Sequence, residues 1–459
     1  MRLISAGAAQ TVTGSCHLIE VNGLKIVFDC GLFQGGRKTE ALNYEPFPFA
    51  PAELDAVVLT HGHLDHVGRL PLLIKGGYKG PIYATLATER ITEIILQDSA
   101  KIQNEDYKRA LRKAERSGRE REVQQPLYMP EDIPAVMELF KRVSFESPLE
   151  LGNKVSLTLY PSGHILGSGF AEVNSPDGRI ILSGDLGNRE SLLQSDFQLP
   201  RECDAVIIET TYANRTHRPQ AATLQEFRDV LTTAMQNGGK IMIPTFALER
   251  TQVILQQLKN LQDSGEVAKA PVFLDSPMAT KFTKLYQEVA NEFLPEIQKD
   301  LASGDDPFEP DTLTYTNTAD ESKAINDVKG AAIIVAGSGM MSGGRILHHL
   351  KHNLWRDNAH LVVVGYQAYG TLGRRLVDGE DEVRIYGDTI KVRADIHTIG
   401  GFSAHADKDD LLTWLEPTGK TPVYMVHGEV DVMTEFERTL HERGREAVMV
   451  ARNKPYDLI

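Results

Sequence analysis

The stretch Thr60-His61-Gly62-His63-Leu64-Asp65-His66 decides the fold of this chain, because it places four potential metal ligands within six residues. It continues a short apolar run, Ala56 to Thr60, which is typical of a buried strand. Sheets of α/β proteins place their sites at the carboxyl ends of strands. Histidine makes up only 14 of 459 residues, so a chance cluster or a solvated turn explains the pattern poorly. Closely spaced donors on a loop are what a zinc site requires, and the stretch predicts such a loop.

The spacing within the loop separates the four side chains into two pairs. His61 and His63 can point at one ion, whereas Asp65 and His66, on the first turn of the following helix, can reach a second ion about 3.5 Å away. More donors are needed, and each lone candidate is more often a structural residue or a turn than a ligand. Because the loop already indicates a metal site, three isolated residues at predicted strand ends become ligand candidates: His164, Asp185 and His427.

The rest of the chain indicates one domain that is interrupted by another. The opening reads as strands over Met1 to Ala6, His17 to Val21 and Leu24 to Asp29, with Asn22-Gly23 as a hairpin turn. From about 213 to 391, strands and helices alternate, which predicts a parallel-sheet α/β unit. Its predicted strands are Lys240 to Pro244, Val272 to Asp275, Ala331 to Ala336 and Leu361 to Gly365. After it, the segments Ile396 to Phe402 and Val423 to His427 again show the pattern of the first part, in which a histidine follows a strand. The middle is therefore expected to be an insertion.

Composition is that of a soluble globular protein, with 41% hydrophobic and 24% charged residues and no low-complexity tract. The first residues lack a secretion signal, no run of about 18 apolar residues could span a bilayer, and we expect a cytoplasmic protein. The 3 cysteines argue against a disulfide framework. Lysine and arginine number 49 against 63 acidic residues, a net charge of −14 that repels nucleic acid on average. Local positive charge or bound metal would have to offset it.

These motifs resemble those of the metallo-β-lactamase superfamily, in which Asp29, the His61 to His66 loop, His164 and Asp185 follow one another in this order. That match spans the first 210 residues. Later motifs look like those of the β-CASP nucleases, the group with the endonuclease subunit of the cleavage and polyadenylation specificity factor and its shorter prokaryotic relatives. These motifs are Glu209 in IETTY, His405 in GFSAHAD, His427, PTFALERTQ (244–252), DSPMA (275–279), GSGMMSGGR (337–345) and GYQAYGTLGR (365–374).

The resemblance implies an α/β fold, an αββα metallo-β-lactamase sandwich with an inserted parallel-sheet α/β β-CASP domain. The sandwich would comprise residues 1–212 and 391–459, and the β-CASP domain residues 213–390. It also implies a zinc-dependent ribonuclease that hydrolyses RNA phosphodiester bonds as an endonuclease, with 5′-3′ exonucleolytic cleavage as a second mode. Two zinc ions per chain would activate the attacking water. The first would be held by His61, His63 and His164, the second by Asp65, His66 and His427, with Asp185 bridging both.

The resemblance also suggests roles beyond metal binding. His405 is the expected general acid, oriented by Glu209, and Asp65 and Asp185 would act in catalysis through the metals. A capping role at a helix start, near Ser403, is the structural alternative for His405. Asp29 is expected to accept a hydrogen bond from a metal-bound histidine. In the inserted domain, phosphate contacts are expected from the glycine-rich loop, which a tight turn would equally explain, and from Arg250, Ser338, Arg345 and Arg374.

Three other functions stay open at this level. A lactone or thioester hydrolase would share the metal site but would not need an insertion of about 180 residues. A DNA-directed nuclease would use the same phosphate contacts. A non-catalytic RNA-binding subunit would require broken motifs, whereas every motif position here is filled. The sequence shows neither an RNA-binding KH module before the first strand nor a long extension after the last. The expected partners are RNA and no membrane, with a homodimer as an open alternative.

Overall fold

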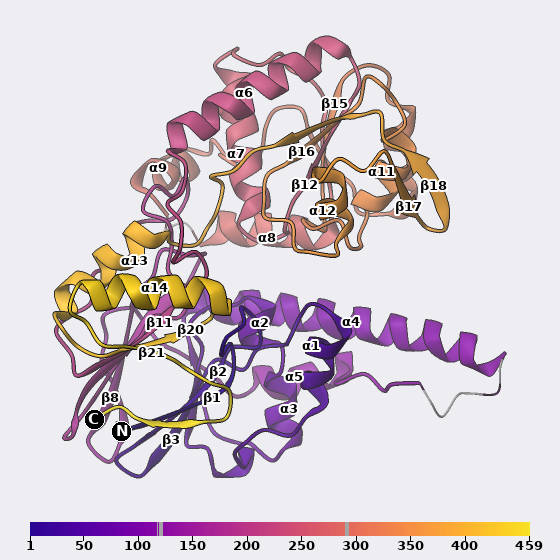
Figure 1. Cartoon of the computed structure of the whole chain (residues 1–459). Coiled ribbons are helices and arrows are strands. Elements are labelled where there is room, and N and C mark those ends of the chain that lie inside the picture. The colour runs from indigo at the N-terminus through magenta and orange to yellow at the C-terminus, as the bar shows by residue number, and fades with distance from the viewer. Residues whose placement is uncertain (117, 119–122, 290–292) are drawn as a thin grey trace. The chain divides into compact units, whose positions relative to one another are not determined.

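The computed structural model describes residues 1–116, 118, 123–289 and 293–459, and it divides the chain into two compact units. The first unit joins Met1–Thr216 to His405–Ile459, and the second is the continuous segment His217–Ala404. Figure 1 colours the chain by residue number, so that the first unit combines indigo and purple with yellow, whereas the second runs from magenta to orange. The second unit is therefore an insertion into the first, as the sequence predicted.

The first unit is a sandwich of two mixed sheets. One sheet has the strand order β22 (Pro455–Asp457), β1 (Arg2–Gly7), β2 (Cys16–Val21), β3 (Leu24–Phe28), β4 (Ala56–Val58), β5 (Ile82–Ala84) and β6 (Phe140–Arg142). The other has the order β21 (Ala447–Met449), β20 (Val423–Val426), β11 (Ala205–Glu209), β10 (Gly178–Leu182), β9 (Gly169–Ser175), β8 (Val155–Pro161) and β7 (Leu149–Gly152).

Alternation along the strands builds three hydrophobic layers. Ile180 and Ile207 point into the core between the two sheets, whereas their neighbours Ile181 and Ile208 pack on the outer side of the second sheet. There they meet Trp414 and the side chains of two late helices. A third layer covers the outer side of the first sheet with helical side chains. Burial on both faces explains why these strands are almost wholly apolar.

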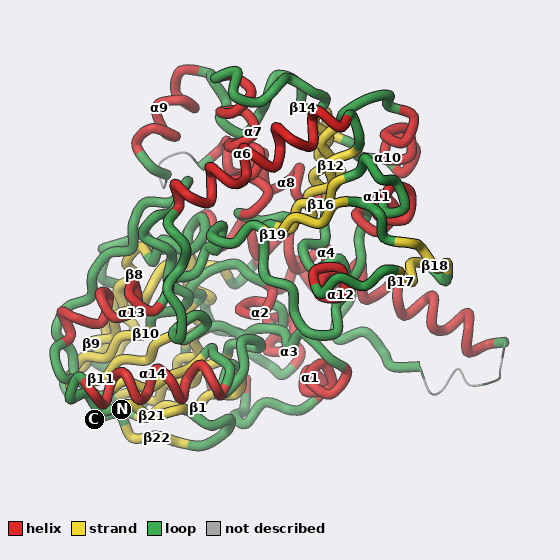
Figure 2. The backbone as a smooth tube through the Cα atoms, turned by 45° about the horizontal axis from the view of Figure 1, so that its top comes forward, coloured by secondary structure: helices red, strands yellow, loops and turns green. Residues whose placement is uncertain are grey.

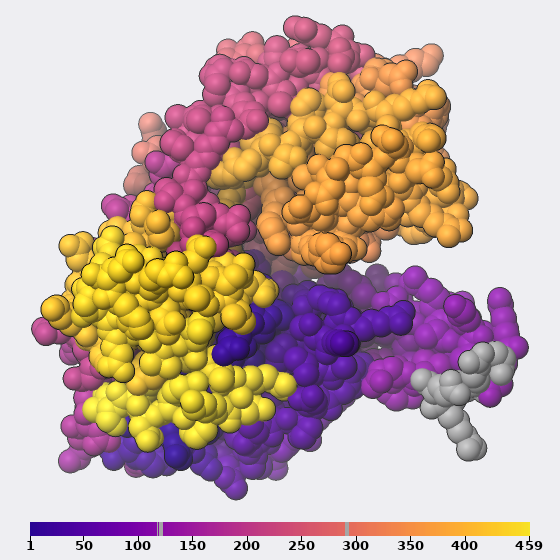
Figure 3. All heavy atoms as spheres, viewed as in Figure 1, coloured from indigo at the N-terminus to yellow at the C-terminus, as the bar shows by residue number. Residues whose placement is uncertain are grey.

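Helices cover both outer faces of this sandwich (Figure 1). Those against the second sheet are α13 (Lys408–Leu415) and α14 (Val430–Glu442). The others are α1 (Arg37–Ala41), α2 (Leu64–Val67), α3 (Leu70–Lys75), α4 (Leu86–Glu115) and α5 (Ile133–Met137). Because β22 pairs antiparallel with β1, the two chain ends lie side by side, and Figure 3 shows yellow and indigo atoms in contact.

The second unit is built around a parallel sheet with the strand order β14 (Leu313–Tyr315), β13 (Val272–Asp275), β15 (Ala332–Ala336), β12 (Lys240–Pro244), β16 (His360–Val363) and β19 (Asp395–Thr398). Figure 2 shows helices on both sides of these strands. The helices are α6 (Gln220–Asn237), α7 (Arg250–Asp263), α8 (Pro277–Glu288), α9 (Pro295–Ser303), α10 (Ala319–Ala324), α11 (Ile346–Asn353) and α12 (Leu372–Val377). A hairpin of β17 (Glu382–Ile385) and β18 (Asp388–Lys391) completes the unit. The predicted fold class is confirmed.

The borders of the units differ from the expected domain limits. The segment Ile396 to Phe402 was expected to begin the returning part of the sandwich, but β19 pairs in register with β16 at the edge of the inserted sheet. The reason is that a short apolar strand does not reveal in its sequence which sheet it joins. Among the described residues, no helix is both long enough and apolar enough to cross a membrane.

Candidate metal centre

The histidine loop is held in place by the backbone of the neighbouring strands. Helix α2 begins right after His63, and its carbonyl groups accept hydrogen bonds from chain segments that flank β2 and β3. The N–H of Cys30 donates to the His66 carbonyl at 2.7 Å, and that of Ser15 donates to Asp65 at 2.8 Å. A Cβ atom at Gly31 would lie 1.5 Å from the Asp65 carbonyl oxygen, so only glycine lets the two segments lie this close.

The first set of donors is made by His61, His63, His164 and Asp185. Nδ1 of His63 lies 3.0 Å from Nε2 of His61 and 3.3 Å from Nε2 of His164. Oδ2 of Asp185 lies 3.5 Å from the His61 nitrogen and 3.6 Å from the His164 nitrogen. Tetrahedral zinc with bonds of about 2.0 to 2.2 Å separates its donors by about 3.3 to 3.6 Å. The set therefore has the spacing of a zinc site.

The second set is made by Asp65, His66 and His427. Nε2 of His427 lies 3.3 Å from Nε2 of His66 and 3.4 Å from Oδ2 of Asp65. The other oxygen of Asp185, Oδ1, lies 3.4 Å from the His66 nitrogen. The two oxygens of Asp185 thus face different donor sets.

The buried Oδ1 of Asp185 supports a metal at this position. It has no hydrogen-bond partner among the described residues, although a buried carboxylate oxygen is normally satisfied. Imidazoles and carboxylates are the donors that zinc takes, and a bridging cation would satisfy the unpaired oxygen. The donors present at this site therefore fit two zinc ions.

Burial and charge set the protonation of the donors. Burial lowers the pKa of His63 to about 4 and that of His61 well below its ordinary value, so both rings are neutral near pH 7. At His66, burial opposes the charged form, but the carboxylates of Asp185 and Asp29 outweigh it and raise the pKa. Neutral imidazoles and ionised carboxylates are the forms that bind metal, so a metal at His66 would displace the proton of this ring.

Asp29 fixes the orientation of the His66 ring from the side opposite the donor set. Its Oδ2 accepts hydrogen bonds from Nδ1 of His66 at 2.7 Å and from the Thr60 hydroxyl at 2.8 Å, while Oδ1 accepts from the Thr60 N–H at 2.8 Å. The bond at Nδ1 leaves Nε2 of His66 as the nitrogen that faces the donor set. The hydrogen bond between Asp29 and a candidate ligand histidine is present, whereas metal at His66 stays a prediction.

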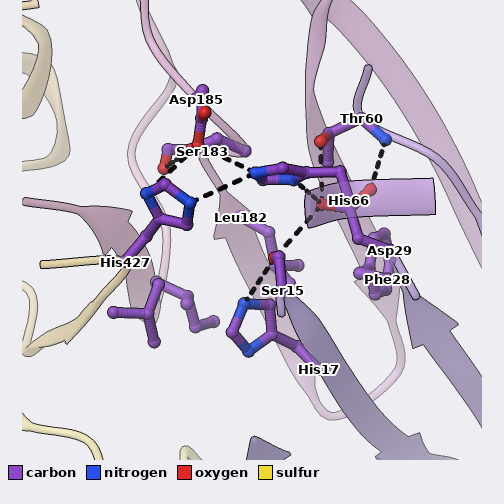
Figure 4. Close-up of a pocket in the computed structure, with 13 residues that line it drawn as sticks. Ser15, His17, Phe28, Asp29, Thr60, His66, Leu182, Ser183, Asp185 and His427 are labelled. Carbon is purple, nitrogen blue, oxygen red and sulfur yellow. Dashed lines mark hydrogen bonds and ion pairs between the residues drawn. The ribbon is translucent and has the colours of Figure 1, made fainter. Parts of the chain in front are cut away.

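Figure 4 shows that Asp29 is connected through Ser15 to His17. The Ser15 hydroxyl lies 3.5 Å from Asp29 and 3.1 Å from Nε2 of His17, and the residues line a cavity of about 20 Å³. Burial lowers the pKa of His17 to about 3, which keeps the ring neutral. The sequence analysis missed both residues. A polar histidine inside the apolar strand His17 to Val21 was the signal that could have revealed them.

His405 lies beside the metal donors and is held by Glu209. Its Nδ1 is 3.3 Å from Oε1 of Glu209 and 3.9 Å from Oδ2 of Asp185. Glu209 is fully buried and also accepts the backbone N–H groups of Leu186 and Thr211. Burial disfavours a charged His405 ring, but the Glu209 carboxylate outweighs it and raises the pKa. The structure thus brings together the two residues that the sequence paired as a general acid and its positioning carboxylate.

The expected phosphate-binding residues all lie in the second unit. Arg345 donates through Nη1 to Asp275 at 2.7 Å and to the Thr316 carbonyl at 3.0 Å. Arg374, on α12, forms an ion pair with Asp378 at 2.9 Å. The Ser338 hydroxyl donates to the Gly343 carbonyl at 3.3 Å inside the glycine-rich loop, and Arg250 is the first residue of α7. Two of the arginines thus bind carboxylates of their own unit.

The sandwich and the two donor sets that share one aspartate define a metallo-hydrolase, and comparisons with known proteins agree. Residues 10–244 match the model of the metallo-β-lactamase superfamily, and residues 251–376 match the β-CASP domain. Residues 389–450 match the Zn-dependent metallo-hydrolase RNA specificity domain. The chain belongs to the metallo-β-lactamase superfamily and, within it, to the β-CASP family.

Relatives resemble the chain over nearly its whole length. A ribonuclease of Thermus thermophilus is 42% identical over 98% of this chain and 98% of its own length. A transcription termination factor, FttA of Methanocaldococcus jannaschii, is 29% identical over 99% of this chain and 71% of its own length. A crystal structure from Enterococcus faecalis, of a protein of unknown function, superposes with a TM-score of 0.55 over 99% of both chains at 13% identity, a likeness of fold alone.

Proposed function

We propose that the chain is a zinc-dependent ribonuclease that hydrolyses RNA phosphodiester bonds, cutting within the strand and, as a second mode, from its 5′ end. The observation that carries this proposal is His405, held 3.3 Å from Glu209 and 3.9 Å from the shared Asp185. A phosphodiester bond is cut only when its leaving oxygen is stabilised, and a proton donor beside the metal donors meets that need. The likeness to a ribonuclease at 42% identity supports RNA as the substrate.

The metal set in this proposal has seven residues. His61, His63 and His164 would hold one zinc ion, Asp65, His66 and His427 a second, and Asp185 would bridge the two. Bound zinc would supply a water of lowered pKa and positive charge that polarises the phosphate. Asp29 contributes by fixing the tautomer of His66 through the 2.7 Å hydrogen bond.

His405 supplies the proton in this proposal. Glu209 accepts a hydrogen bond from Nδ1, which leaves Nε2 as the nitrogen that gives its proton to the departing 3′ oxygen of the RNA. Glu209 is a positioning residue, because its backbone contacts keep both carboxylate oxygens in place. The raised pKa of His405 keeps a larger fraction of the ring protonated near neutral pH.

The second unit offers unequal candidates for phosphate contact. Arg374 is half-exposed and its partner Asp378 lies four residues further on, at the end of α12, a kind of pair worth only about 0.5 kcal/mol. A phosphate can therefore take over that guanidinium. Arg345 is bound to a fully buried Asp275, so we assign it to the support of the glycine-rich loop. Arg250 and Ser338 stay proposed phosphate contacts. We also propose a cytoplasmic location, which suits an RNA substrate.

The test is cleavage of RNA and DNA of one sequence by zinc-loaded protein. Each nucleic acid is labelled at the 5′ end or internally, and the products are sized over time. We expect internal fragments from RNA and little turnover of DNA, and Asp185→Ala should abolish both. Equal or faster cleavage of DNA would contradict the RNA assignment. Inert nucleic acid together with rapid hydrolysis of a thioester or lactone would overturn the proposal in favour of a small-molecule hydrolase.

A further inference from the structure

A further group of candidate metal donors lies in the inserted unit, apart from the two sets described above. It consists of His360, the first residue of β16, and Asp395 and His397, on the edge strand β19. The two strands are parallel and in register, with His360 opposite Asp395 and Val362 opposite His397. Residues two apart on a strand share a face, so the ladder places all three side chains on one face of the sheet.

Their donor atoms converge at metal-like distances. Nδ1 of His360 lies 3.1 Å from Nε2 of His397 and 3.7 Å from Oδ2 of Asp395. The two imidazole nitrogens are as close as those of His61 and His63 in the first donor set, which are 3.0 Å apart. Donors around tetrahedral zinc are about 3.3 to 3.6 Å apart, so small side-chain movements suffice to hold an ion.

Hydrogen bonding alone serves this group poorly. Burial lowers the pKa of His360 and of His397, so both rings are neutral near pH 7 and each carries one N–H. The amide of Asn237, at the end of α6, lies 3.0 Å from Nε2 of His360 and can set which ring nitrogen of His360 is protonated. One N–H at Nδ1 could serve only His397 or Asp395. With the ring proton on Nε2 instead, where the Asn237 amide would accept it through its oxygen, Nδ1 is free and one cation would bind all three atoms.

We propose that His360, Asp395 and His397 form a third metal site, for zinc or a similar first-row divalent cation. Two imidazoles and one carboxylate are donors that such ions accept, and the open side toward Asp395 leaves room for a solvent ligand. His360 is fully buried and Asp395 is exposed, so the ion would enter from the surface. Its effect is to tie the edge strand β19 to β16. The site has a structural function and is independent of RNA cleavage.

The test is the metal content of the full chain after equilibrium dialysis against buffered free Zn²⁺ at rising concentrations. The wild type should bind one equivalent more than His397→Gln and than Asp395→Asn, with RNA cleavage unchanged in both variants. Because Asp395 is exposed, Asp395→Asn should fold normally, and a loss of metal in this variant cannot be due to unfolding. The matched control is His352→Gln, an exposed histidine on α11 of the same unit. It should keep the full metal content.

A second measurement separates this site from the catalytic donors. In a chain that carries His63→Ala and Asp185→Ala, we expect one equivalent of Zn²⁺ to remain, and adding His397→Gln should remove it. Zn²⁺ should also slow hydrogen exchange in β19 of the wild type but not of His397→Gln. Equal zinc content in the wild type, His397→Gln and Asp395→Asn would overturn the proposal and leave His360 and His397 as a plain hydrogen-bonded pair.

Discussion

Asp29 shows how much of the metal centre depends on single side chains outside the donor sets. Its backbone has a φ of 58°, and His427 has a φ of 49°, both in the left-handed region that non-glycine residues seldom adopt. Such strain costs on the order of 1 to 3 kcal/mol per residue and persists only where the surroundings compensate. At Asp29 the compensation comes from His66 and from both donor groups of Thr60. The strain is thus concentrated at residues that orient or belong to the candidate metal donors.

Replacing Asp29 with asparagine should weaken metal binding. The amide keeps the size of the side chain but loses the charge that supports the His66 N–H, and such supporting contacts are typically worth about 10- to 100-fold in metal affinity. Zinc titration monitored by competition with a chelating dye measures the affinity. Asp55→Asn is the control, because Asp55 is an exposed carboxylate of the same unit that accepts the backbone N–H of Lys25. Unchanged affinity in Asp29→Asn would contradict this role.

Replacing His405 with alanine should separate catalysis from metal binding. Since His405 is outside both donor sets, the variant should keep its zinc, while RNA cleavage falls by about two to four orders of magnitude through loss of the general acid. Single-turnover cleavage and metal analysis of the same sample give the two values. His441→Ala, an exposed histidine on α14, should be fully active. A fully active His405→Ala enzyme would disprove the general-acid assignment.

At the scale of elements, helix α13 follows His405 and begins with a crowded group of carboxylates. Oδ1 of Asp407 accepts the N–H groups of Asp409 and Asp410 and caps the helix. Burial and the nearby charge of Asp407 raise the pKa of Asp410 to about 6. A carboxyl whose pKa is raised on folding stabilises the folded state at low pH, where it is protonated. That contribution is lost as the pH rises through about 6.

The variant Asp410→Asn should therefore be more stable than the wild type at pH 7.5. Solvent screens this half-buried group, so we expect a gain of up to about 1 kcal/mol, or about 2 to 4 °C in Tm. The advantage should disappear below about pH 4, where Asp410 is protonated in the folded and unfolded chains alike. Thermal unfolding between pH 4 and 8 measures it. A constant difference across this range would show that the charge is not the cause.

At the scale of the whole molecule, the candidate metal donors come from distant parts of the chain. His61 and His427 are separated by most of the sequence, yet both contact Asp185. A metal held only by the folded chain stabilises it by mass action, about 4 kcal/mol at a thousandfold excess over the dissociation constant. Removing the metal should lower the Tm of the first unit by on the order of 10 °C.

Thermal unfolding before and after chelation, and again after zinc is returned, checks this expectation. Zinc should restore the wild type, whereas Asp185→Ala should gain little because both donor sets lose their shared carboxylate. The Tm of the second unit should change on chelation only if the proposed site of His360, Asp395 and His397 holds metal. If chelation leaves the Tm of the first unit unchanged, the convergence of these residues does not depend on metal.

Part of the site could be predicted because its determinants are local. The spacing of donors in the His61 to His66 loop is recognisable in the sequence, as is the order in which Asp29 precedes the loop and His164 and Asp185 follow it. Other features have no local signature. The connection of Asp29 through Ser15 to His17 depends on the pairing of β2 with β1 and β3. The ion pair between Arg345 and Asp275 likewise has no signature in either segment. A lone polar residue in a strand or loop does not reveal its partner, since the partner lies far along the chain.

By itself, the sequence predicted the sandwich, the insertion and the candidate metal donors, because apolar periodicity and closely spaced histidines are properties of short segments. Only the tertiary structure decided which oxygen of Asp185 faces which donor set, that β19 belongs to the inserted sheet, and that His360 meets His397. These facts depend on strand order and register. Both are set by packing and hydrogen bonding between distant segments, which no single stretch of sequence contains.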